Sequence, residues 1–402
     1  MKSPIIIFLS LAVVTISVHS QALVETGNGK MPGEWIDKDT HHRIIHLTGS
    51  GGANASFYFN NNPFTGDKMV YYNTAGKWKQ LYAVNLKTGV TEKLTTQNAP
   101  MSGEIVCAKT GEAFYQVKDS IFCTNINSKK TRLVYVFPAG FKAGVSTVNA
   151  DASLLAGVWS TDAEKEILKN NPEKHDYFDK IYESREPRTM FTINTHSGEM
   201  KKILTDSAWL NHLLFSPTDP SLLMFCHEGP WHKIDRIWTM NLVTGKIALM
   251  HKRTMPMEIA GHEWFAPDGK TIWFDLQKPR SENFFVAAAD VQTGKEKMYR
   301  LSRNEWSVHF NISPDQQLFC GDGGNEGQVA KAKDGMWIYL FKPEGDHFVS
   351  EKLVNMKHHD YKLEPNVHFS PDGKWIIFRA NFEGVEDVYA VEVEKARSIT
   401  AK

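Results

Sequence analysis

A turn of the form Phe/Ile-x-Pro-Asp recurs along this 402-residue chain and constrains its fold more than any other feature. After each turn come an apolar strand, a gap, a second strand of alternating character, and a polar turn around Thr-Gly or Ser-Gly. Clear examples are FSPTDPSLLMF with RIWTMNLVTGKIALM, FAPDGKTIWFD with FFVAAADVQTGKEKMYRL, and FSPDGKWIIFRAN with DVYAVEV. With two degenerate copies, at AKTGEAFYQV and VNADASLLAGVW, the chain holds seven such units.

Repeats of roughly forty to sixty residues are typical of the four-stranded blades of β-propellers. The turns support this reading, because Pro-Asp-Gly and Thr-Gly supply the backbone conformations that hairpins need. We therefore predict an all-β, seven-bladed β-propeller. Residues 43–48 precede the first full unit, and we expect this N-terminal strand to join the last blade and close the ring. A polar, helix-like insertion at residues 160–187 is expected to lie over one face.

The N-terminus carries one lysine, an apolar run at residues 5–16 and small residues after it. This pattern predicts a signal peptide at residues 1–20, followed by a single propeller domain at residues 21–402. No later apolar stretch could stop transfer, so we expect an exported protein, periplasmic or extracellular, without a membrane span.

Overall charge excludes some partners. Lys+Arg and Asp+Glu both number 46, so no global field favours nucleic acid or an anionic membrane, and an acidic ligand must be captured locally. The four cysteines show no metal-type pairing; buried thiols are the favoured reading, with a disulfide left open. They are Cys107, Cys123, Cys226 and Cys320.

Histidine recurs at one position of the repeat. Three residues before the Phe or Ile of the four best turns, the chain has histidine three times and asparagine once. These positions are His212, His262, His309 and Asn366, with Glu364 and His368 flanking the last. Equivalent positions in successive blades form an arc at one end of the channel. A lone histidine is more often structural, but an arc with carboxylate and amide groups suits a divalent metal or a general base.

A second polar cluster lies in CHEGPWHKIDRIW, residues 226–238. Its members are His227, Glu228, His232, Asp235 and Arg236. The spacing matches no zinc signature. The guanidinium of Arg236 could bind a carboxylate bidentately beside the histidine arc, although an ion pair with Asp235 or Glu228 on the surface is an equal alternative.

These motifs resemble those of the oligogalacturonate lyases over nearly the whole mature chain. The resemblance runs from DKDTHHRIIHLT through TDSAWLNHLLFSPTDPSLLMFCHEGPWHKIDRIW and GHEWFAPDG to FSPDGKWIIFRANFEGVEDVYAVEV. It implies a seven-bladed propeller that cleaves short pectic oligosaccharides, an acidic substrate, by β-elimination.

Site roles follow from the resemblance by motif. It implies that His262 is the catalytic base, that Arg236 is the catalytic arginine, and that His309 helps to hold a metal, usually Mn²⁺. The family's Gln-x-x-His-x-His run in the last blade supplies the other ligands. Here that run reads YKLEPNVH, so Tyr361, Glu364 and Asn366 replace those ligands, and His368 follows. A carboxylate and an amide replace nitrogen ligands by oxygen ligands, which hard cations prefer, so Ca²⁺ or Mg²⁺ becomes as plausible as Mn²⁺.

We expect the metal, held by His309 and Glu364 with Asn366 or His368, to neutralise the uronate carboxylate while His262 removes the C5 proton. His212, His227 and His232 are expected to line sugar subsites. A lyase for another uronate glycan and a non-catalytic TolB-like binding module are the alternatives. The sequence does not indicate an oligomeric state.

Overall fold

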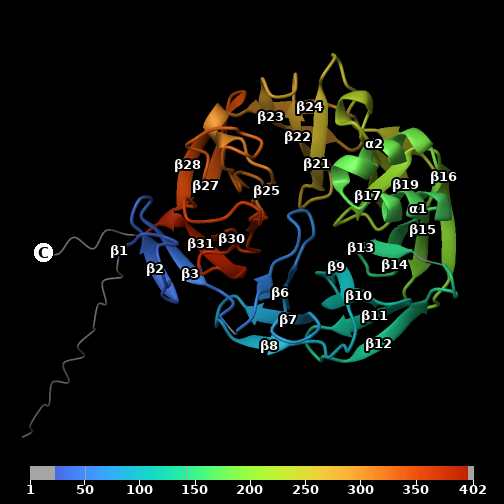
Figure 1. Ribbon diagram of the computed structural model, residues 1–402, viewed down its shortest axis with the longest axis horizontal. Helices are drawn as coiled ribbons and strands as arrows, with labels where there is room; N and C mark the ends of the chain where they lie inside the picture. The colour runs from blue at the N-terminus through green and yellow to red at the C-terminus, as the bar shows by residue number, and fades with distance from the viewer. Residues whose placement is uncertain (1–22, 50, 142, 397–402) are drawn as a thin grey trace, which may run out of the picture.

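The computed structural model describes residues 23–49, 51–141 and 143–396. Its strands form small antiparallel sheets set like blades around a central axis (Figure 1). The predicted all-β propeller is confirmed. The predicted signal peptide at residues 1–20 lies outside the described residues, and among those described no helix is long and apolar enough to cross a membrane.

The described strands form six sheets, and dividing the eight-stranded sheet at its single parallel pair gives the seven groups below. The groups follow the chain, except that its first described strands belong to the last group. The first two groups contain β4 (Asn54–Ala55), β5 (Phe64–Thr65), β6 (Lys68–Asn73), β7 (Gln80–Asn85) and β8 (Thr91–Lys93), then β9 (Met101–Cys107), β10 (Glu112–Val117), β11 (Ser120–Asn125) and β12 (Thr131–Val136). The next two contain β13 (Gly144–Val148), β14 (Leu154–Trp159), β15 (Arg188–Asn194) and β16 (Met200–Asp206), then β17 (Trp209–Phe215), β18 (Leu222–Glu228), β19 (Ile237–Asn241) and β20 (Ile247–Leu249).

The fifth and sixth groups share one eight-stranded sheet, joined only at the pair Arg300 and His347. They contain β21 (Ile259–Phe265), β22 (Thr271–Gln277), β23 (Phe284–Asp290) and β24 (Glu296–Arg300), then β25 (Phe310–Ile312), β26 (Phe319–Gly321), β27 (Trp337–Glu344) and β28 (His347–Asn355). Two short 3-10 helices, η1 (Trp231–Lys233) and η2 (Arg303–Glu305), lie in connections between strands.

The last group closes the ring with strands from both ends of the described chain. It contains β29 (His368–Phe369), β30 (Trp375–Ala380) and β31 (Asp387–Lys395), together with β1 (Leu23–Val24), β2 (Glu34–Asp37) and β3 (His42–His46). Strand β3 pairs antiparallel with β31, and Ile44 lies opposite Val391. The predicted closure by an N-terminal strand is confirmed.

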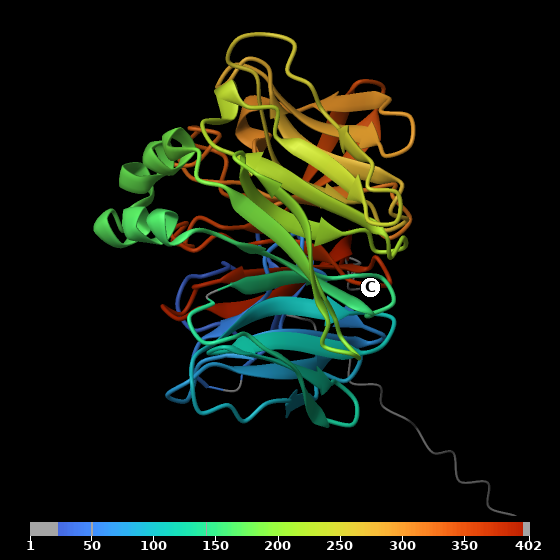
Figure 2. The ribbon, with the colours of Figure 1, turned by 90° about the vertical axis from the view of Figure 1, so that its right-hand side faces the viewer.

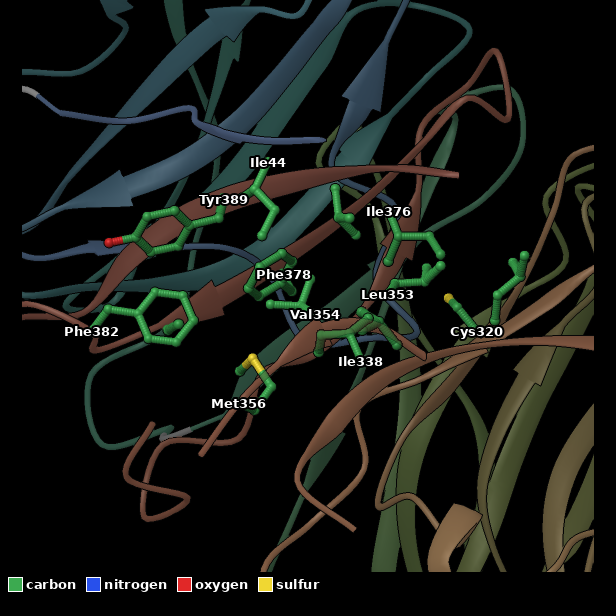
Figure 3. Packing of buried hydrophobic residues seen from close by; sticks show 14 of the residues in the cluster. Ile44, Cys320, Ile338, Leu353, Val354, Met356, Ile376, Phe378, Phe382 and Tyr389 are labelled. Carbon is green, nitrogen blue, oxygen red and sulfur yellow. The ribbon is translucent and has the colours of Figure 1, made fainter. Parts of the chain in front are cut away.

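Apolar side chains between neighbouring blades form the core. Figure 3 shows Ile44 of β3 and Tyr389 of β31 near Ile338 and Leu353 of the preceding blade. Burying a side chain of this size stabilises the fold by about 1.5–3 kcal/mol. All four cysteines are buried free thiols, as favoured from sequence.

The predicted insertion is helical and stands out from one side of the ring (Figure 2). It forms α1 (Asp162–Asn170), capped by the Thr161 side chain, and α2 (Lys174–Ser184). Arg188 of β15 holds α1 through a buried ion pair with Glu164, its Nε atom 2.6 Å from the carboxylate. The ring of Phe178 on α2 lies 5.1 Å from that of Trp209, at the start of β17. The insertion therefore covers the end of the ring where the innermost strands begin.

One loop, residues 56–63 between β4 and β5, enters the centre of the ring and is here called the channel loop (Figure 1). Several blades hold it. The backbone N–H of Tyr58 donates to Glu104 at 2.7 Å and that of Phe59 donates to Asn366 Oδ1 at 3.1 Å. The side-chain amide of Asn60 donates through Nδ2 to the backbone carbonyl of Glu263 at 3.2 Å. These bonds fix the loop across the channel.

Candidate active site

Two of the innermost strands bulge at the histidine position. In β17 the register with β18 shifts between Asn211 and Leu214, and in β21 the register with β22 shifts between Gly261 and Trp264. His212 and His262 lie in these bulges with φ of 46° and 47°. Few residues other than glycine adopt positive φ, and bulges often re-aim a side chain next to an active site. These two blades therefore bend the same repeat position out of the ordinary strand alternation.

A fixed position on the second strand lies behind each member of the arc. The Phe or Ile of each turn pairs with a residue of the second strand, and the side chain in question lies three residues after that partner. This position holds Cys226 behind His212, Asp275 behind His262, and Asp322 behind His309. Two of the three histidines thus have a buried carboxylate at their back. The sequence already contained this signal at the ends of the repeats FAPDGKTIWFD and ISPDQQLFCGD.

His262 is set for proton transfer. Its Nδ1 atom lies 3.3 Å from Asp275 Oδ1, although the two atoms are not aligned as a hydrogen bond. Burial alone would lower the pKa of His262, but the Asp275 carboxylate outweighs burial and raises it. A side chain at Gly261 would meet the Trp231 ring at 2.9 Å, so glycine is needed for this packing. Because Nδ1 faces Asp275, Nε2 is the atom left to accept a proton.

His309 lies next to His262, with ring centroids 5.1 Å apart. Its Nδ1 is 2.8 Å from Asp322 Oδ2, and an ionised carboxylate can only accept, so Nδ1 carries the hydrogen. The lone pair is then on Nε2, which lies 3.3 Å from the Tyr58 hydroxyl and 3.8 Å from Glu364 Oε2. This carboxylate-backed imidazole is the arrangement that protein metal ligands usually have.

Arg236 is buried beside the two histidines and is no surface residue. Its Nη1 donates to Glu228 at 2.7 Å, and its Nε donates to Glu263 at 3.1 Å. Asp235, the other partner considered from sequence, binds Arg253 instead. The guanidinium holds the pKa of Glu228 well below its usual range despite the burial that opposes this. Arg236 is therefore a fixed positive charge, offset by two carboxylates.

Tyr58 of the channel loop is a site residue that sequence reasoning missed. Its hydroxyl contacts His309, and the charges of Glu364, Glu263 and Arg236 act on it. Burial is the main reason why the pKa of Tyr58 is raised, so the hydroxyl keeps its proton. No repeat position marks this residue, because it reaches the site from a loop of another blade.

His212, predicted to line a sugar subsite, is partly exposed and pairs with Glu228. Its Nε2 lies 3.2 Å from Glu228 Oε2, and its side chain is 40% exposed. Together with Cys226, these two side chains bring a nitrogen, a sulfur and an oxygen within 4.8 Å of one another. Glu228 thereby connects His212 to Arg236.

Two predicted metal ligands are placed elsewhere, which corrects the sequence interpretation. Asn366 uses its Oδ1 to accept from Phe59 and its Nδ2 to donate to the Glu364 carbonyl, so it holds the channel loop. The Nε2 atom of His368 faces the carbonyls of Tyr58 and Asn61, both at 3.2 Å. Its Nδ1 atom faces the Asn366 carbonyl at 3.1 Å, so both ring nitrogens are directed at backbone oxygens of the last blade and the channel loop.

Two of the predicted sugar-subsite histidines also lie apart from the paired imidazoles. The ring of His227 stacks on Trp238, with centroids 4.8 Å apart, on the opposite face of β18 from Glu228. His232 lies in η1, where its carbonyl accepts from Arg253. Tyr361, which takes the place of the expected glutamine, is buried and donates to the Asp322 carbonyl at 3.1 Å. It supports the site from behind.

A divalent metal fits the remaining donor set in part. His309 offers a lone pair fixed by Asp322, and Glu364, whose side chain is 42% exposed, offers carboxylate oxygens beside it. One imidazole and one carboxylate suit Mn²⁺ or Mg²⁺ when water and ligand oxygens complete the coordination. The predicted set of four protein ligands is thus reduced to these two.

A cavity of about 740 Å³ lies on the other side of the channel loop. Its walls include Phe215, Phe265, Phe369 and the prolines that follow them, at the end where the innermost strands finish. His368 lines this cavity, whereas His262 and His309 do not. The channel loop therefore separates the cavity from the histidine pair.

Comparison with known families identifies the chain. The model of the oligogalacturonate lyase family matches residues 33–397, nearly the whole propeller. The chain belongs to the oligogalacturonate lyase family. The family is one of polysaccharide lyases, and the resemblance noted from the motifs is confirmed.

Relatives within this family are distant in sequence but match along their length. The oligogalacturonate lyase of Dickeya dadantii is 24% identical over 89% of this chain and 95% of its own. The oligogalacturonide lyase of Pectobacterium atrosepticum is 22% identical over the same shares. Among solved structures, an oligogalacturonate lyase in complex with manganese shares the fold with a TM-score of 0.77 at 20% identity, covering 90% of this chain and 96% of that one. That of Vibrio parahaemolyticus gives 0.76 with the same identity and coverage.

Proposed function

We propose that this chain cleaves uronic-acid oligosaccharides, of the oligogalacturonate type, by β-elimination with His262 as the base. The observation that supports this most strongly is the pair of neighbouring imidazoles, His262 and His309, each with a buried aspartate behind it, beside the buried Arg236. Family membership favours a lyase over a non-catalytic binding module.

In this mechanism His262 Nε2 takes the C5 proton of the uronate. The electron pair of that bond forms the C4–C5 double bond, the C4–O4 bond breaks, and the leaving oxygen takes a proton from water. Asp275 holds the ring and favours the imidazolium that forms. A divalent cation held by His309 and Glu364 would neutralise the uronate carboxylate and so make the C5 proton more acidic.

Arg236 acts on the substrate through its positive charge and does not bind the uronate carboxylate directly. Bidentate binding of a substrate carboxylate would require Glu228 or Glu263 to release the guanidinium, because both carboxylates already occupy it. We therefore assign Arg236 to electrostatic stabilisation of the negative charge that develops on the uronate. Trp231, whose ring lies 5.1 Å from the guanidinium carbon, excludes water from one side of it.

A uronate other than galacturonate is the second candidate. It is favoured by the last blade, where Tyr361, Glu364 and Asn366 stand in place of the family's glutamine and two histidines. Only the carboxylate of Glu364 faces His309, so the set of groups around a substrate carboxylate differs from the family pattern.

The test follows the ultraviolet absorbance of the unsaturated uronate product, using oligogalacturonates and then other uronate oligosaccharides. His262→Asn is the variant of choice, because asparagine tolerates the positive φ at this position. We expect a loss of about 10²- to 10⁴-fold. His347→Asn, at a half-exposed position on the outermost strand of its blade, is the matched control and should keep full activity.

Chelation is the second arm of the test. EDTA should abolish product formation, and Mn²⁺, Mg²⁺ or Ca²⁺ should restore it if His309 and Glu364 hold the cation. Full activity in His262→Asn would exclude this residue as the base. No product on any uronate glycan with any of these cations would exclude the lyase function.

We also infer export. The apolar run at residues 5–16, followed by small residues, supports cleavage near residue 20. N-terminal sequencing of the protein from the cell envelope and the medium tests this inference, since an intact Met1 would contradict it.

A further inference from the structure

The Tyr58 hydroxyl and a bound cation would both bind to Nε2 of His309. Because Nδ1 of His309 donates to Asp322, the only lone pair of this imidazole lies on Nε2. The Tyr58 hydroxyl is 3.3 Å from this atom and donates to it. A cation that binds His309 must therefore displace this hydrogen bond.

The displaced hydroxyl stays close to His309, because Tyr58 is only partly exposed and its backbone is fixed. Tyr58 is held from both sides, its N–H by Glu104 and its carbonyl by His368. Its ring packs edge-on against His309, with centroids 5.1 Å apart. A polar group in such a setting costs free energy when it loses its partner. The hydroxyl then needs an acceptor within the site.

The incoming uronate supplies that acceptor. Glu364, the carboxylate next to His309, would already be engaged with the cation, and Glu263 is engaged with Arg236. An oxygen of a uronate carboxylate drawn to the cation would arrive beside His309, where the hydroxyl has just been released.

We propose that Tyr58 couples the binding of the cation to the binding of the uronate. Its hydroxyl donates to His309 Nε2 when no cation is bound, and it donates to a uronate oxygen when a cation binds that nitrogen. Tyr58 is a positioning residue in this scheme, which rests on the proposed function for its ligands. It explains why the channel loop is fixed by hydrogen bonds from several blades, since the exchange needs a hydroxyl held within hydrogen-bond distance of His309 Nε2.

The scheme predicts two effects of opposite sign for Tyr58→Phe. Without its competitor, His309 should bind Mn²⁺ about two- to tenfold more tightly in the absence of substrate, the range expected for one net hydrogen bond. The KM for the oligosaccharide should rise by a similar factor at saturating Mn²⁺. A purely structural role would weaken both interactions together.

Isothermal titration of the chelator-treated protein with Mn²⁺ alone gives the first value, and initial rates give the second. Tyr135→Phe, on the outermost strand of another blade, is the matched control and should change neither. Unchanged or weaker Mn²⁺ binding by Tyr58→Phe, with an unchanged thermal midpoint, would overturn the coupling. So would tighter Mn²⁺ binding with an unchanged KM. Failure of the lyase function itself would appear separately, as an absence of product from the wild type, while the Mn²⁺ titration still reads the competition.

Discussion

His309 Nδ1 lies 2.8 Å from Asp322 Oδ2, and both side chains are almost completely buried. The neighbouring blade repeats this pair as His262 and Asp275, at 3.3 Å and without hydrogen-bond alignment. One repeat position thus gives two imidazoles of different character. The hydrogen bond to Asp322 fixes the lone pair of His309 on Nε2, where a ligand can bind it. Asp275 acts on His262 mainly through its negative charge, which raises the pKa of His262.

Asp275→Asn should move the acid limb of the pH profile to lower pH. His262 must be neutral to accept a proton, and Asp275 raises its pKa, so the wild type needs a higher pH to become active. Without the carboxylate, burial lowers the pKa of His262. Profiles of kcat/KM against pH for both proteins measure this, and an unchanged limb would show that another group sets it.

The same pair has a linked effect on stability. Because the folded-state pKa of His262 is raised, the stabilisation by its protonated form is present at low pH and is lost as pH rises through the folded value. Asp275→Asn should reverse this part of the pH dependence of unfolding, because burial then lowers the folded-state pKa of His262 below its unfolded value and stability falls as pH decreases. Chemical unfolding of both proteins across the pH range measures the change.

Arg236→Met should destabilise the protein by about 3–5 kcal/mol, since it leaves two buried carboxylates without their partner. Lys87→Met is the control. Lys87 pairs with Asp67 on the surface, where both side chains are more than half exposed, and its loss should cost at most about 1 kcal/mol. Chemical unfolding of the three proteins compares the two costs, and equal values would mean that Arg236 is dispensable to the fold.

His368→Gln should flatten the acid side of the stability profile. Burial lowers the pKa of His368 to about 4, so between that pH and its ordinary value near 6.5 the unfolded chain binds a proton that the folded chain does not. Wild-type stability should fall by roughly 1.4 kcal/mol per pH unit through this window as pH decreases. Glutamine cannot titrate and keeps a donor for the two carbonyls. The exposed His347→Gln should leave the slope as it is.

Much of the architecture follows from the sequence, because the turns and alternating strands are local and repeat. The adjacent positions of His262 and His309 belong to this class, and the helical insertion shows as a local break in the repeat. The closing strand joins residues far apart in the chain, and it follows from the need of a ring of blades to pair its ends. The repeat register also fixes Asp275 and Asp322, although only the structure draws attention to them.

The errors have a common physical cause. Asn366 and His368 share the register or its flank, but a polar side chain next to a loop from another blade is used by the unpaired backbone groups of that loop. Tyr58 was missed for the converse reason, since it reaches the site through a contact between residues far apart in the chain. The repeat predicts the position of a residue on its strand, whereas its hydrogen-bond partner depends on backbone groups from distant parts of the chain.

The position of the closing strand sets the order in which the site can be built. Strand β3 needs β31 as its partner, and the channel loop, which follows β3 in the chain, is held by residues of the last blade. During synthesis the early blades emerge long before those partners exist. His309, Glu364 and Tyr58 can therefore meet only after nearly the whole chain has been made, so a truncated or stalled product would carry most of the blades and yet lack a competent centre.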